Sequence, residues 1–139
     1  MKFQLRWGND EKTIIVIDMQ SGWDWQDFYA IHPAYKVMLD SVEHEVHLIY
    51  LPQAGAVALP PNAIYHMRRL MQTTTHVREG LNILVGHLPV LASILKIMKN
   101  MYGVRHLVDK YHLVPDLETA YAVLANYEAM QRRKEHRTA

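Results

Sequence analysis

The chain has 139 residues, of which 50% are hydrophobic and 21% are charged, and its formal net charge is +1. This length can bury one sizeable core, and so weak a charge argues against nucleic acid as the partner. The absence of cysteine excludes a disulfide framework, a thiolate metal site and a thiol nucleophile.

The first segments of the chain predict a β-hairpin. Apolar and polar residues alternate from Phe3 to Trp7, and Gly8-Asn9-Asp10 has the composition of a turn. The run from Thr13 to Ile17 is almost entirely apolar. We therefore expect the first strand at an edge of a sheet and the second at its centre.

A helix is predicted after this hairpin. Asp24 suits its N-cap, and Trp23 and Phe28 have the spacing of a hydrophobic staple. Pro33 removes a backbone donor and should kink or split the helix. Because the staple and the core use Trp23 and Phe28, Trp25 is left as an exposed aromatic residue available to anchor a partner.

The central feature of the sequence is a strand, a loop and a helix between residues 45 and 71. The apolar strand ends before Pro52, the loop runs to Pro61, and Asn62 suits the N-cap of the next helix. Ligands and partners of α/β folds tend to bind at such strand-to-helix junctions. This junction is therefore the first candidate for a functional surface.

Two more strands and two more helices complete the pattern. Residues 81–85 predict a strand, and Pro89 suits the first turn of an apolar helix. Residues 104–108 predict a last short strand, and Asp116 suits the N-cap of the final helix. The basic end past Gln131 is expected to fray.

The order of predicted elements is therefore β-β-α-β-α-β-α-β-α. Strands that alternate with single helices imply right-handed crossovers, so we predict an α/β fold with a mixed, mostly parallel five-stranded sheet, an N-terminal hairpin and four helices. We expect one domain over residues 1–130 and a basic tail over residues 131–139. The sequence shows neither a signal peptide nor a membrane span, so a cytoplasmic protein is expected.

This order of elements resembles STAS-type domains, the family of anti-sigma-factor antagonists and of the cytosolic regions of sulfate transporters, and their SpoIIAA-like relatives. The resemblance covers nearly the whole chain. It rests on the leading hairpin, on the strand from Val46 to Leu51 that leads through a loop to Asn62, on the strand and turn from Leu81 to Pro89, and on the closing segment from Leu107 to Ala120.

The resemblance implies a regulatory domain, but one feature of the family is missing. In the antagonists, a serine at the start of the helix after the central strand is phosphorylated by a partner kinase, and the change in charge controls partner binding. Residues 52–71 contain neither serine nor threonine. The phosphorylation switch therefore does not carry over, and a docking role for this loop and helix is what the resemblance still implies.

The residues of this segment favour the same docking role. An apolar loop on a protein surface usually needs cover, which a protein partner or a second copy of the chain in a homodimer would supply. Folding of the loop back onto its own sheet is the alternative. The predicted partner-binding residues are Ala54, Val57, Leu59, Tyr65, Arg68 and Arg69.

A small anionic ligand is the alternative function. The turn that contains Gly86 and His87 precedes a predicted helix, whose first N–H groups and dipole favour a phosphate or a carboxylate. The sequence has neither GxGxxG nor GxxxxGK[ST], so no particular nucleotide class is indicated.

Catalytic and metal sites are not predicted. His44 and His47 lie three residues apart at a helix-to-strand transition, and no third ligand has the spacing to complete a tetrahedral site. The serines lie in no GxSxG context. We therefore expect a non-enzymatic protein with no metal and no cofactor.

Overall fold

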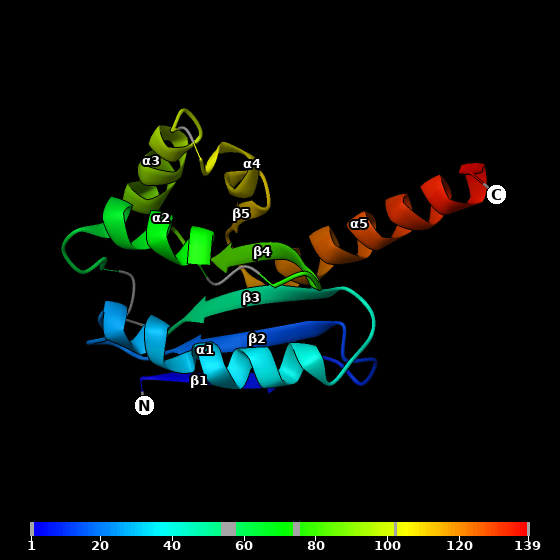
Figure 1. Ribbon diagram of the computed structural model, residues 1–139, viewed down its shortest axis with the longest axis horizontal. Coiled ribbons are helices and arrows are strands. Elements are labelled where there is room, and N and C mark those ends of the chain that lie inside the picture. Colours follow the sequence, from blue (N-terminus) through cyan, green and yellow to red (C-terminus); the bar gives the residue numbers. More distant parts are fainter. Residues whose placement is uncertain (1, 54–57, 74–75, 102, 139) are drawn as a thin grey trace.

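The computed structural model describes residues 2–53, 58–73, 76–101 and 103–138. Within these residues the chain forms five strands and five helices, which Figure 1 shows in chain order. They are β1 (Phe3–Trp7), β2 (Ile14–Met19), α1 (Trp25–Asp40), β3 (Val46–Pro52), α2 (Ala63–Thr73), β4 (Glu79–Val85), α3 (Pro89–Met98), α4 (Arg105–Val108), β5 (Tyr111–Val114) and α5 (Leu117–Thr138).

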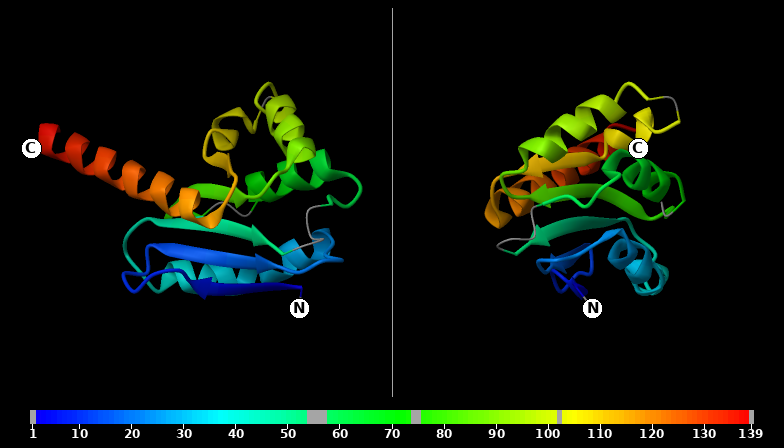
Figure 2. Two further views of the ribbon diagram at one scale, coloured as in Figure 1. Left: turned by 180° about the vertical axis from the view of Figure 1, so that it is seen from behind. Right: turned by 90° about the vertical axis from the view of Figure 1, so that its left-hand side faces the viewer.

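The strands form one mixed sheet whose order follows the sequence, β1-β2-β3-β4-β5. β1 is antiparallel to β2, and every other neighbouring pair is parallel. Right-handed crossovers between adjacent parallel strands place their helices on one face, where α1, α2 and α3 lie (Figures 1 and 2). The predicted α/β class, the hairpin and the mixed five-stranded sheet are confirmed.

Each face of the sheet has its own apolar core, because neighbouring residues of a strand point to opposite faces. Ile15 and Ile17 pack with α1, whereas Ile14 and Val16 pack with Leu124 and its neighbours on α5. A third buried cluster joins α2, α3 and α4. The helical layer on the α1 face therefore consists of two parts, α1 and the group formed by α2, α3 and α4.

The start of α1 is as the sequence predicts. Asp24 and Asp27 form a capping box, in which each side chain accepts a hydrogen bond from the other residue's backbone N–H at 3.2 and 2.9 Å. The rings of Trp23 and Phe28 are 5.2 Å apart, as expected of a staple. Pro33 does not split the helix, because it lies on the exposed side while Ile31 and Tyr35 hold both halves against the sheet.

The prediction of a strand at residues 104–108 is wrong. Val104 and Val108 are one helical turn apart, and both are buried among the side chains of α2 and α3. The N–H groups of Leu107 and Val108 both donate hydrogen bonds to the carbonyl of Val104, which forms the helical turn α4 and places both valines on one side. The last strand is formed instead by Tyr111–Val114, in the segment between the predicted strand and Asp116.

The C-terminal segment also differs from expectation. α5 is continuous to Thr138, past Gln131, where fraying was expected. Its first turns cover the sheet, and its second half extends beyond the sheet (Figures 1 and 2). No helix among the described residues combines the length and apolar character needed to cross a bilayer.

A candidate ligand pocket

A cavity of about 110 Å³ lies between the sheet and the helices of the α1 face. Its floor consists of side chains from β2 to β5, and its walls come from α1, α2, α3 and the segment that precedes α2. The floor residues are Ile17, Met19, Leu48, Tyr50, Leu84 and Tyr111. The cavity therefore lies at the junction of the two parts of the helical layer.

The strand register explains why these floor residues meet. Ile17, Tyr50 and Leu84 are direct neighbours across β2, β3 and β4, so their side chains form one row on one face. In the next row Asn82 lies beside Tyr111. Distant segments of sequence therefore supply one continuous surface.

One end of the pocket is aromatic. The rings of Trp23 and Trp25 meet edge to face at 5.2 Å, and Phe28 stacks on Trp25 at 5.8 Å. Trp25 is only 6% exposed, and its indole N–H donates to the carbonyl of Pro61 at 2.8 Å. The expectation that Trp25 is an exposed anchor is therefore wrong, because its N–H finds a partner in the segment folded over it.

The other end of the pocket is polar and is built around Glu79. This side chain is 9% exposed and lines the cavity. Its carboxylate accepts hydrogen bonds from the Tyr35 hydroxyl at 2.7 Å, from the Asn82 amide at 2.7 Å and from the His76 backbone N–H at 3.3 Å. Every partner is a donor, which is the pattern of an ionised carboxylate.

A β-bulge turns Glu79 into the pocket. Val46 pairs with Glu79 and Leu48 pairs with Asn82, so β4 has one residue more than β3 between these pairs. In a regular strand, residues three apart point to opposite faces. The extra residue places Glu79 and Asn82 on the same face, where they form their hydrogen bond.

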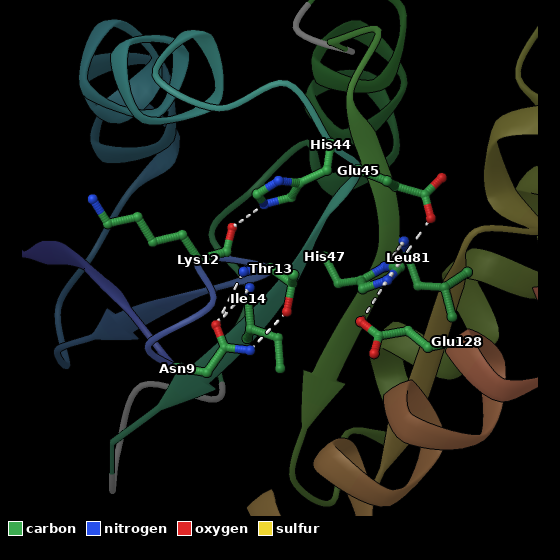
Figure 3. Close-up of polar contacts among 9 residues, drawn as sticks. All are labelled: Asn9, Lys12, Thr13, Ile14, His44, Glu45, His47, Leu81 and Glu128. Carbon is green, nitrogen blue, oxygen red and sulfur yellow. Dashed lines mark hydrogen bonds and ion pairs between the residues drawn. The ribbon is translucent and has the colours of Figure 1, made fainter. Parts of the chain in front are cut away.

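His47 completes the bulge from the opposite face of the sheet. Its Nδ1 accepts a hydrogen bond from the Leu81 N–H at 2.9 Å, and its ring is 2% exposed (Figure 3). A Cβ at Gly80 would overlap this ring, so the bulge needs glycine there. Its Nε2 faces the carboxylates of Glu45 and Glu128, each at 3.8 Å (Figure 3).

This arrangement argues against His47 as a metal ligand. Because Nδ1 accepts from Leu81, the proton of the neutral ring is on Nε2, which then has no free lone pair for a metal. Burial lowers the pKa of His47, although Glu128 acts in the opposite direction. No cluster of three or more metal-binding side chains occurs among residues 2–53, 58–73, 76–101 and 103–138.

The other ionisable groups of the pocket stay neutral near neutral pH. Burial, reinforced by Glu79, raises the pKa of Tyr35 and of Tyr111. Burial, followed by Tyr111 and Glu79, raises the pKa of Tyr50. Burial lowers the pKa of His32 despite the opposing effect of Glu79. The net charge at this end of the pocket is therefore negative.

The structure separates the predicted partner-binding residues. Ala54 and Val57 lie outside the described residues. Leu59 is half-buried and lines the cavity, so this part of the loop folds inward. Tyr65, Arg68 and Arg69 lie together on the exposed side of α2.

The predicted anion-binding turn lies outside the pocket. Gly86 has a φ of 128°, and its N–H donates to the Val114 carbonyl at 2.8 Å. His87 is exposed, and the next residue, Leu88, lines the cavity. The Gly86 amide is thus already used by the turn.

No family model, curated protein or solved structure matches the chain. The functional interpretation therefore rests on the pocket itself. Its key residue, Glu79, was missed from the sequence because the strand was expected to begin at Leu81. The available signal was a carboxylate and an amide, Glu79 and Asn82, at the start of an otherwise apolar run.

Proposed function

We propose that this protein is a non-enzymatic α/β domain that binds a small, largely apolar molecule in the pocket between α1, α2 and the sheet. The observation that carries the proposal is a cavity of about 110 Å³ with an aromatic end and a polar end. Ligand sites are typically concave and mostly apolar, with a few polar groups that orient the ligand.

The size of the cavity favours a ligand over a packing defect. One water molecule needs only on the order of 10–15 Å³, and protein interiors hold few larger voids. The pocket is partly open to solvent, so a ligand can enter it and displace the water there.

A neutral aromatic probe, 2-phenylethanol, tests the proposal. Trp23 and Trp25 line the pocket, so binding is measured by tryptophan fluorescence and by the melting temperature. At ten times its Kd, the probe should stabilise the protein by about 1.4 kcal/mol, which raises Tm by about 3–6 °C.

A matched pair of variants locates the binding site. Leu84→Trp fills the floor of the pocket and should abolish binding. Leu117→Trp enlarges another partly buried leucine, on the α5 face, and should leave binding intact. If 2-phenylethanol binds equally well to both folded variants, its binding site is not this pocket.

A second function, docking of a protein partner or of a second copy of the chain, is supported by the exposed side of α2. Tyr65 is 59% exposed, and Arg69 donates a hydrogen bond to its hydroxyl at 3.4 Å. The Arg69 guanidinium also lies over the Tyr29 ring at 5.6 Å from its centroid. Tyrosine and arginine are common interface anchors, and this pair is already ordered.

Together with this docking function we propose kinship with STAS-type regulatory domains and a cytoplasmic location. The consecutive strand order with an antiparallel first strand supports the kinship. Light scattering tests the docking role: Tyr65→Ala should reduce the mass of a homodimer, whereas Val37→Ala, which alters an exposed apolar residue of α1, should not. If the unmodified protein is a monomer in solution, the homodimer proposal is wrong.

A further inference from the structure

We infer that the ligand of this pocket carries a protonated amine that binds the carboxylate of Glu79. This inference rests on the proposed function and specifies the chemical class of the ligand. It follows from the charges, the hydrogen bonds and the shape of the pocket.

The charge of Glu79 has no cationic partner among the described residues. None of the ion pairs among the described residues includes Glu79, and none of the described lysine or arginine side chains lines the cavity. The nearby imidazole of His32 is neutral near neutral pH because of its burial. A buried carboxylate without a counter-ion is complementary to a cation supplied by a ligand.

The carboxylate is ordered before any ligand binds. The Tyr35 hydroxyl donates to Oε2 of Glu79 and the Asn82 amide donates to Oε1, each at 2.7 Å. Asn82 is itself only 1% exposed. Oε1 accepts only from Asn82 among the described residues, so one lone pair remains for a ligand donor. Little side-chain ordering is therefore needed when an amine binds.

The surrounding hydroxyls can accept the remaining amine protons. Tyr50 and Tyr111 line the cavity, and neither hydroxyl has a hydrogen-bond partner among the described residues. Tyr111 is the direct neighbour of Asn82, which bonds to Glu79. Tyr50 lies one row further along the sheet, with its ring 5.9 Å from that of Phe28. A primary ammonium has three N–H donors, which a carboxylate and phenol oxygens can satisfy together.

The opposite end of the pocket accepts the apolar body of the ligand. Leu48, Tyr50 and Pro52 of β3 line the floor over a length of about 13 Å along the strand. Trp23, Trp25 and Phe28 supply flat apolar walls beyond it. An aromatic or branched aliphatic amine matches this division, whereas a carboxylate ligand would meet the negative charge of Glu79.

Three probes of nearly equal shape test the inference: 2-phenylethylamine, 2-phenylethanol and phenylacetate. Their Kd values are measured by tryptophan fluorescence and calorimetry near neutral pH. The amine should bind at least about ten-fold more tightly than the alcohol, as expected for a hydrogen bond to a charged group, and phenylacetate should bind most weakly.

Variants assign the preference to Glu79. Glu79→Gln should remove the amine preference while the alcohol still binds. Tyr35→Phe keeps the carboxylate and should keep the preference, so it controls for disturbance of the hydrogen-bond network. Should Glu79→Gln fail to fold, the ranking of the three probes in the unmodified protein still decides the question.

The outcomes separate this inference from the proposed function. If the alcohol or phenylacetate binds as tightly as the amine, or if Glu79→Gln keeps the preference, the amine inference is wrong and the pocket stands. If none of the three probes binds, the pocket proposal fails and the inference fails with it.

Discussion

Replacement of His47 by alanine tests whether this buried histidine holds the β-bulge. The change leaves the Leu81 N–H, now bonded to Nδ1 at 2.9 Å, buried without an acceptor. An unsatisfied buried donor costs about 1–3 kcal/mol. The edge-to-face contact with Tyr127, with centroids 5.2 Å apart, is also lost and is worth about 0.5–1.5 kcal/mol.

The expected loss for His47→Ala is therefore about 2–4 kcal/mol. Urea unfolding followed by circular dichroism should show a midpoint lower by about 1–2 M. His44→Ala is the matched control, since His44 is exposed and its Nε2–H donates a hydrogen bond to the Lys12 carbonyl at 2.8 Å. It should cost less than about 1 kcal/mol.

Two results decide the interpretation of His47. His47→Asn offers a carboxamide oxygen near the position of Nδ1 and should recover part of the lost stability. If His47→Ala costs no more than His44→Ala, the imidazole does not support the bulge. The orientation of the Glu79 side chain into the pocket would then have another structural cause.

Three further predictions follow from the same contacts. Since burial lowers the folded-state pKa of His47 below 6.5, the unfolded chain takes up the proton more readily. The free energy of unfolding should therefore be unaffected by this group above pH 6.5 and should decrease as the pH falls below 6.5. In unfolding titrations, His47→Asn should show a smaller decrease, and His32 should account for the decrease that remains. Gly80→Ala forces a Cβ into the His47 ring and should cost about 1–3 kcal/mol in urea unfolding, whereas an equal stability would contradict the close approach. Asp24→Ala removes the capping box of α1 and should lower Tm, at a cost of about 0.5–2 kcal/mol, and an unchanged Tm would show that the cap is dispensable.

Local chemistry was enough to predict most of the elements. The alternation from Phe3 to Trp7, the capping residues of α1 and the apolar run of β3 each depend on near neighbours in sequence. The order of strands and helices then implied the α/β class. The errors occurred where distant contacts outweigh local preference, as at α4, where Val104 and Val108 turn toward α2 and α3.

The pocket depends on relations that no single segment contains. The sequence by itself determined that a carboxylate and an amide occur in a largely apolar strand, and that Tyr35, Tyr50 and Tyr111 are among the tyrosines elsewhere in the chain. Only the tertiary structure decided that Glu79 and Asn82 share a face, because the bulge arises from the pairing of β4 with β3. It likewise brought Tyr35, Tyr50 and Tyr111 into the pocket that holds that carboxylate, since strand register and helix placement are set by packing across the whole sheet.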